Sequence, residues 1–140
     1  MKALTVCQPY ASAFFMAEAF RKRVENRNWP TRYRGPLLIH AGKSKEYMDG
    51  FDPDDEDDFD PLFLPLKGQN LPFGAIIGMV EMIDCLMLAD YMAKYGPDPW
   101  ANGHWCHVYA APELLSQPIP YRGQLGIFNV PDQIFKRVKP

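Results

Sequence analysis

The chain has 140 residues, of which 47% are hydrophobic, 14% aromatic and 23% charged, a balance typical of one globular domain. No apolar run is long enough to span a membrane, and the N-terminal residues lack the apolar core of a secretory signal. Three widely separated cysteines suit free thiols rather than a disulfide framework. We therefore predict a cytoplasmic protein with no membrane partner, built as a single domain over residues 1–140.

The formal net charge of −2 hides a strong asymmetry along the chain. Residues 1–48 hold nine Lys and Arg against three Glu, whereas residues 49–60 hold eight acidic residues and no basic one. Six of the sixteen residues of RKRVENRNWPTRYRGP, which runs from Arg21 to Pro36, are Lys or Arg. An anionic ligand near residues 1–48 would therefore experience a local positive electrostatic field, although the net charge of the chain is negative.

Strand and helix patterns alternate in the first half of the chain. Residues 2–6 predict a short strand, and residues 8–20 predict a helix. The apolar side chains of that helix recur every three or four residues: Tyr10, Ala13, Phe14, Ala17 and Phe20. The basic segment should be extended or looped, because Pro30 interrupts it. A buried strand is predicted at 36–41, and one or two helical turns at 43–51.

The second half begins with an acidic stretch at about 50–61, which we predict to be a mobile loop because its like charges repel. It is either a solvated insertion or a shield that lies over the basic segment. Residues 73–88 form the strongest β pattern, with glycines that indicate a bulge. A short helix should end at Gly96, and short strands are predicted at 104–110, 117–121 and 124–130. These elements predict an α+β fold, a small and mostly antiparallel β-barrel with flanking helices.

Several stretches of the sequence carry a family resemblance: LTVCQPYASAF, KRVENRNWPTRYRGPLLIHAGK, GAIIGMVEMIDC, HWCHVYAAP and PIPYRGQLGIFNV. Their order and spacing resemble the activating-signal-cointegrator homology (ASCH) domain of the PUA-like superfamily. The family signature G-x-K-x-x-E-x-R corresponds here to FRKRVENR, with Lys22, Glu25 and Arg27. Phe20 replaces the signature Gly, a residue that tolerates a left-handed turn.

The resemblance implies a PUA-like β-barrel with a cleft, lined by the signature, between helix and barrel. It also implies a role with RNA or modified bases, with which the superfamily is associated. Some small ASCH proteins resemble amidohydrolases that deacylate N4-acylated cytidine, and others are proposed nucleases or RNA-binding modules. The amidohydrolase-like members can carry Thr at the position of Glu25. The resemblance thus leaves open whether this chain is an enzyme, and the candidate hydrolase activities are an N4-acylcytidine-type amidohydrolase and a nuclease.

The signature side chains have the chemistry for base recognition or acyl transfer. Glu25 and Arg27 are two residues apart, so in an extended segment they point to one face. A desolvated Lys22 would have a lowered pKa and could act as base or nucleophile, while Glu25 would hold it or exchange a proton. Arg27 would bind a phosphate or an oxyanion. We predict Lys22 and Glu25 as catalytic residues; the alternative is an ion-pair network that pins the helix end to the barrel.

Further candidates for nucleotide contacts surround the signature. Gln8 offers a donor and an acceptor for a base edge. Tyr10 and Trp29 either stack on a base or pack in the core. The residues after Trp29 either continue a phosphate-binding rim or form a solvated surface. The predicted nucleotide- or RNA-binding residues are Gln8, Tyr10, Arg27, Trp29, Thr31, Arg32 and Arg34.

The other polar residues suggest fewer roles. His40, in an apolar strand, is predicted to be a satisfied core histidine. The spacing of HWCH (104–107) does not match a zinc site, so we predict no metal and no cofactor. Glu81 and Asp84 should face opposite sides of their strand, and one could add a second carboxylate to the cleft. RNA or a nucleotide is the predicted partner; the alternative functions are a non-catalytic RNA-binding module and a protein-interaction domain in transcriptional or translational control.

Overall fold

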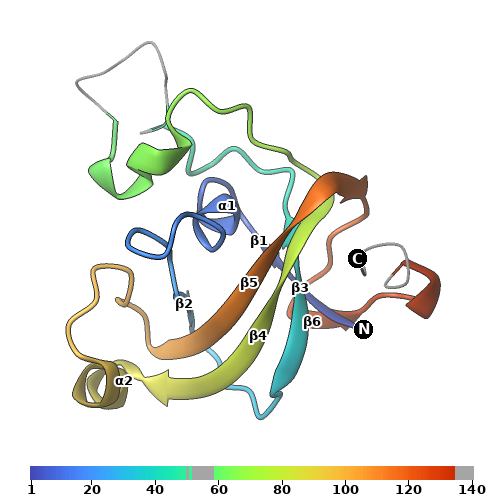
Figure 1. Ribbon diagram of the computed structural model, residues 1–140. Coiled ribbons are helices and arrows are strands. Elements are labelled where there is room, and N and C mark those ends of the chain that lie inside the picture. The colour runs from blue at the N-terminus through green and yellow to red at the C-terminus, as the bar shows by residue number, and fades with distance from the viewer. Residues whose placement is uncertain (50, 52–58, 135–140) are drawn as a thin grey trace.

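A six-stranded sheet in the order β2-β5-β4-β3-β1-β6 organises the molecule (Figure 1). The structure is a computed structural model and describes residues 1–49, 51 and 59–134. The strands are β1 (Lys2–Val6), β2 (Val24–Arg27), β3 (Gly35–Ala41), β4 (Ala75–Met87), β5 (Trp105–Pro120) and β6 (Ile127–Asn129). The helices are α1 (Tyr10–Ala13), the 3-10 helix η1 (Pro61–Leu66) and α2 (Leu88–Tyr95). The strands predicted at 2–6 and 36–41 are confirmed.

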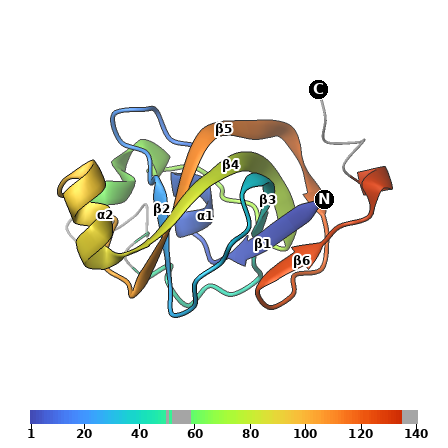
Figure 2. The same cartoon turned by 90° about the horizontal axis from the view of Figure 1, so that it is seen from below.

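The sheet is mixed and strongly curled. β1 and β3 pair in parallel, whereas β1–β6, β3–β4, β4–β5 and β2–β5 are antiparallel. The register between β4 and β5 shifts at three places, and such bulges bend a strand and increase its twist. β4 and β5 consequently arch over the interior, and the sheet forms a half-barrel (Figure 2). The predicted α+β fold, a small mostly antiparallel barrel with flanking helices, is confirmed.

Gly78 lies at the first of these register shifts, as the sequence predicted for a glycine in this strand. A Cβ atom at Gly78 would lie 2.5 Å from the ring of Phe15 and 2.7 Å from the carbonyl oxygen of Glu113. Only glycine therefore lets these three parts of the chain approach so closely. The separate strands predicted at 104–110 and 117–121 are wrong: both belong to β5, because β4 provides a continuous partner from Ala75 to Met87.

α1 lies under the arch of β4 and β5 (Figure 2) and packs Phe14, which follows it, against the central strands. The helix predicted over 8–20 is wrong in its extent, since α1 ends at Ala13. The Ala13 carbonyl accepts a hydrogen bond from the Lys22 amide at 2.9 Å, which draws the chain back toward the sheet. Ala17 and Phe20 are then exposed rather than buried. The early end of α1 thus brings the signature residues beside the barrel.

A second core cluster fills the side of the molecule beyond α1. It joins Val24 of β2 to Phe63 of η1, Tyr91 of α2 and Trp100 of the segment that returns to β5. α2 is capped by Gly96, whose φ of 85° favours glycine, so the predicted helix end is confirmed. This cluster fixes the connection between α2 and β5 against the inner side of β2.

The sequence predicts one or two helical turns at 43–51. At the described positions of this region the chain forms turns and no helix. Most of the predicted acidic loop, residues 52–58, lies outside the described residues. At its end, the Asp60 carboxylate accepts a hydrogen bond from the Leu62 amide at 2.9 Å and begins η1. Among the described residues, no helix combines the length and hydropathy needed to cross a bilayer.

Candidate functional site

An open cavity of about 420 Å³ lies between the C-terminal end of β1, the start of α1 and β2. The three charged residues of the signature, Lys22, Glu25 and Arg27, all line it. The walls come from Asn26, which stands between Glu25 and Arg27, and from other segments that supply Thr5, Cys7, Tyr10, Tyr47 and Asn102. The cavity therefore combines a charged floor with aromatic and polar walls.

Glu25 links the two cations of this floor. Its Oε1 lies 3.4 Å from Lys22 Nζ, and its Oε2 accepts a hydrogen bond of 2.9 Å from Arg27. Glu25 and Arg27 meet because β2 is extended and places every second side chain on one face. Arg27 also donates to the Thr5 carbonyl at 2.9 Å, which ties β2 to the end of β1. The arrangement holds two positive charges and one negative charge within one hollow.

Lys22 is almost completely buried, with 3% of its surface exposed. Its ammonium donates to the Val24 carbonyl and lies over the rings of Tyr10, Phe14 and Trp100, at 5.5, 5.4 and 5.7 Å from their centroids. Burial lowers the pKa of Lys22 below its ordinary value of 10.5, while the neighbouring Glu25 opposes this shift. The amine is thus enclosed by aromatic rings and shifted toward its neutral form.

Two tyrosines form the aromatic wall of the cavity. The ring of Tyr10 meets that of Tyr47 edge-on at 5.7 Å, and on another side it meets Phe63 at 5.4 Å. Tyr47 is 51% exposed, so this part of the wall faces solvent. Burial raises the pKa of both Tyr10 and the Cys7 thiol, so both groups are protonated at neutral pH.

Asn26 fixes the opposite wall. Its side-chain nitrogen donates to the Trp100 carbonyl at 2.8 Å, and its oxygen accepts from the amides of Asn102 and Gly103 at 3.0 Å each. A Cβ atom at Gly103 would lie 2.4 Å from the Asn26 Cβ, so this approach requires glycine. The segment between α2 and β5 therefore reaches the cavity, with Trp100 beneath Lys22 and Asn102 on the rim.

Several predicted binding residues do not line the cavity. Gln8 is fully buried, donates to the Pro72 carbonyl and accepts from the Ser12 amide, both at 2.9 Å. Trp29 packs its ring edge-on against buried His107 at 4.8 Å, and its carbonyl lies 2.9 Å from His107 Nε2. The placement of Gln8 and Trp29 thus serves packing and internal hydrogen bonding.

The predicted basic rim also lies apart from the cavity. Thr31 accepts a hydrogen bond from the Tyr33 amide, and Arg32 is exposed. Arg34 donates to the Thr31 and Tyr33 carbonyls and lies 4.0 Å from Asp84. Neither Asp84 nor Glu81 lines the cavity, so the predicted second carboxylate is not found there.

His40 is a satisfied core residue, as predicted. It is 1% exposed, its Nδ1 lies 3.1 Å from Thr5 Oγ1 and its Nε2 lies 2.6 Å from the Tyr121 carbonyl. Burial lowers the pKa of His40, so the ring is neutral at pH 7. Among the described residues, no three His, Cys, Asp or Glu side chains gather closely enough to hold a metal ion.

The sequence reasoning missed the walls contributed by Thr5, Cys7, Tyr47 and Asn102. Only Asn26 had a signal, because it stands inside the signature between Glu25 and Arg27. Thr5 and Cys7 stand inside LTVCQPYASAF but have no pattern of their own that marks them as cavity residues, and the proximity of Tyr47 and Asn102 depends on the fold.

Comparison with known proteins decides the family. The ASCH domain family matches residues 4–125. The chain belongs to the ASCH domain family. Activating signal cointegrator 1 from Homo sapiens is 26% identical over 144 residues, and the protein of the same name from Mus musculus is 26% identical over 145. Each alignment covers 97% of this chain but 23% of the relative, so the chain spans less than a quarter of the length of these relatives.

Solved ASCH structures share the fold. ASCH from Zymomonas mobilis superposes with a TM-score of 0.57 at 10% identity, over 97% of this chain and 91% of that one. A mutant of it gives a TM-score of 0.56, also at 10% identity, over 97% and 94%. The ASCH family is associated with RNA binding. The resemblance seen in the sequence is therefore confirmed at the level of family and fold.

Phe20, which replaces the signature Gly of the ASCH family, fits this backbone. Among the described residues other than glycine, only Ala111 has a positive φ. Phe20 therefore does not need the left-handed conformation that a glycine would allow. Its side chain is 54% exposed in the turn after α1 and does not line the cavity.

Proposed function

We propose that this ASCH domain binds RNA by placing a base or modified base in the cavity above Lys22, Glu25 and Arg27. The observation that supports this most directly is the convergence of the three charged groups in one open cavity walled by Tyr10 and Tyr47. The floor carries one excess positive charge, which suits the carbonyl and phosphate oxygens of a nucleotide.

Arg27 is the residue best placed to touch such a ligand. One of its terminal nitrogens donates to Glu25 and Thr5, and a guanidinium has five N–H donors in a fixed planar fork. The remaining donors have no hydrogen-bond partner among the described residues, and the side chain is 25% exposed. Glu25 holds the guanidinium in position, so Arg27 can present its free edge without reorganising.

Binding is testable by titration calorimetry with cytidine, N4-acetylcytidine and hexacytidylate. Arg27→Gln should weaken the binding of each by roughly 10-fold or more, because a charge-assisted hydrogen bond contributes about 1.5–3 kcal/mol. Arg122→Gln removes an exposed arginine outside the cavity and should bind like the wild type. The proposal fails if none of the three ligands binds, or if Arg27→Gln binds as well as the wild type while remaining folded.

A second candidate function is hydrolysis of the amide of an N4-acylated cytidine. It is favoured by the buried Lys22, whose pKa is lowered and whose ammonium lies 3.4 Å from Glu25. The neutral amine would take a proton from water as the water oxygen adds to the acyl carbon, and Arg27 would donate to the oxyanion. The C–N bond would then break, with N4 taking the proton from Lys22, to release cytidine and a carboxylic acid.

This reaction is tested by incubating the protein with N4-acetylcytidine and separating the products. Lys22→Met keeps much of the aliphatic volume and leaves Glu25 paired with Arg27, so it is the appropriate comparison. We expect the wild type to release cytidine and Lys22→Met to lose that activity. Equal inertness of the two proteins would remove the hydrolase proposal and leave the binding proposal in place.

A further inference from the structure

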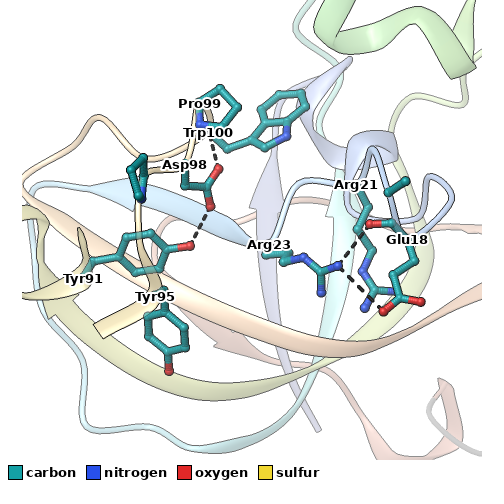
Figure 3. A pocket seen from close by; sticks show the side chains of 10 residues that line it. Glu18, Arg21, Arg23, Tyr91, Tyr95, Asp98, Pro99 and Trp100 are labelled. Carbon is teal, nitrogen blue, oxygen red and sulfur yellow. Dashed lines mark hydrogen bonds and ion pairs between the residues drawn. The ribbon is translucent and has the colours of Figure 1, made fainter. Parts of the chain in front are cut away.

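A second hollow, of about 740 Å³, contains none of the residues Lys22, Glu25 and Arg27. We call these three residues the triad, and the cavity that they line the triad cavity. Figure 3 shows Glu18, Arg21 and Arg23 on one side of the second hollow and Tyr91, Tyr95 and Asp98 on the other. We call it the arginine hollow, after Arg21 and Arg23.

The arginine hollow and the triad cavity are lined by neighbouring residues of one short segment. Residues 21–23 lie outside helix and strand, and Arg21 and Arg23 line the arginine hollow while Lys22, between them, lines the triad cavity. Trp100 lines the arginine hollow, and its ring centroid lies 5.7 Å from Lys22 Nζ. One short run of three cations therefore supplies both sites.

The two arginines differ in how they are held. The Arg21 guanidinium makes no hydrogen bond or ion pair with any other residue that the structure describes. Arg23 donates to the Glu18 carbonyl at 3.0 Å, and its guanidinium lies 4.0 Å from the Glu18 carboxylate. The Glu18 side chain is 82% exposed, so this ion pair is weak, and an anion that binds Arg23 more tightly can displace Glu18.

The other acid of the hollow is already occupied. Asp98 accepts a hydrogen bond of 2.6 Å from the Tyr91 hydroxyl with one oxygen, and one of 2.9 Å from the Trp100 amide with the other. Asp98 keeps its charge, but both of its oxygens are engaged by the wall, and it forms no ion pair with Arg21 or Arg23 among the described residues. Glu18 is the group that competes with an incoming anion for Arg23.

We propose that Arg21 and Arg23 bind the phosphate of the nucleotide that flanks the one in the triad cavity, so that the ligand is a single-stranded RNA rather than a free nucleoside. This inference rests on the proposed RNA-binding function and extends it to a second subsite. Two guanidinium groups beside an aromatic wall are suited to a phosphodiester, because each presents planar N–H pairs to its oxygens. Because Arg21, Lys22 and Arg23 are consecutive and line the two hollows between them, one strand could reach both sites.

The test compares hexacytidylate with cytidine, using the double variant Arg21→Gln/Arg23→Gln. Hexacytidylate should bind more tightly than cytidine to the wild type. The double variant should lose roughly 10-fold in hexacytidylate affinity, and its salt dependence should fall by about 0.7 in log–log slope for one phosphate contact on a single strand. Cytidine affinity should stay unchanged, because the triad cavity is intact.

Glu18→Gln provides a matched gain-of-function control. Removing the competing carboxylate should strengthen hexacytidylate binding about twofold and leave cytidine binding unchanged. Arg122→Gln, an exposed arginine outside both hollows, should have no effect on either ligand.

The possible results separate the two proposals. Wild-type affinity of the double variant for hexacytidylate, or an equal loss for cytidine and hexacytidylate, would overturn the phosphate subsite while leaving the triad cavity as a base-binding site. Equal displacement of hexacytidylate by a phosphoserine peptide would likewise overturn a strand-binding role. If the wild type binds neither cytidine nor hexacytidylate, the proposed function fails together with the subsite.

Discussion

Lys22 and Arg34 stand in the same basic segment and carry the same charge, yet the fold treats them in opposite ways. Lys22 is buried among three aromatic rings and ion-paired with Glu25. Arg34 is exposed, donates to two local carbonyls and forms a loose ion pair with Asp84. The difference follows from where the backbone places each residue. The Lys22 amide donates to the Ala13 carbonyl, which holds Lys22 beside α1 just before β2 pairs with β5, whereas Arg34 lies in the connection between β2 and β3 and is exposed. Charge density alone therefore does not mark a binding site.

The largest effect is expected from removing Glu25, the carboxylate partner of the buried Lys22. Glu25→Ala would leave Lys22 buried without its carboxylate partner, and breaking a buried ion pair costs about 3–5 kcal/mol of the free energy of unfolding. Urea denaturation should show this loss. Glu18→Ala, which removes the acid of an exposed pair from the same region, should change stability little. A stability of Glu25→Ala equal to that of the wild type would mean that the carboxylate does not support the buried amine.

Gly103→Ala should disturb the wall that Asn26 fixes. The added Cβ would overlap the Asn26 Cβ at 2.4 Å, and such overpacking typically costs about 1–3 kcal/mol. We expect lower stability and weaker cytidine binding, because the segment that carries Trp100 and Asn102 must move. Gly68→Ala, at a positive φ but with open space around it, should lower stability without changing cytidine affinity. Unaltered binding by folded Gly103→Ala would show that this wall does not shape the cavity.

The buried amine should also appear in the pH dependence of stability. Burial lowers the pKa of Lys22 below its ordinary value of 10.5, so between the folded and the unfolded pKa the unfolded chain binds the extra proton. The free energy of unfolding must then rise with pH across this window, and the contribution is lost as the pH falls through the folded pKa. The measurement is urea unfolding of the wild type and Lys22→Met from neutral pH to 10.5. The wild type should gain stability relative to Lys22→Met as the pH rises, and parallel curves would contradict the shift.

Local patterns in the sequence were sufficient for some elements and insufficient for others. The short strand predicted at 2–6 and the apolar run at 36–41 correspond to β1 and β3, and Gly96 marks the end of α2 as predicted. The lengths of α1 and β5 were wrong, because the Lys22 amide takes the Ala13 carbonyl and because β4 offers a continuous partner for β5. Both causes are long-range contacts that no window of sequence contains.

The site residues also differ in whether local sequence was enough to place them. The period-two spacing of Glu25 and Arg27 predicted that they share a face, and β2 places them so. Gln8 had suitable chemistry for a base edge, but the sequence could not reveal that the Ser12 amide and the Pro72 carbonyl engage both ends of its side-chain amide. Tyr47 joins the cavity only through the fold, opposite Tyr10.

The smallest effect is expected from Arg32 and Arg34, the exposed arginines that follow Pro30. The double variant Arg32→Gln/Arg34→Gln removes two exposed charges that do not line the triad cavity. Because these arginines lie outside the cavity, they should attract the RNA phosphates only through the long-range electrostatic field, which salt screens. Hexacytidylate affinity should therefore fall about twofold at low salt, and the loss should vanish as salt is raised. Anisotropy titrations at two salt concentrations measure both quantities. A loss as large as that of Arg27→Gln would mean that RNA also binds along the segment of Arg32 and Arg34. Burial of a basic residue in the cavity would then not predict where the ligand binds.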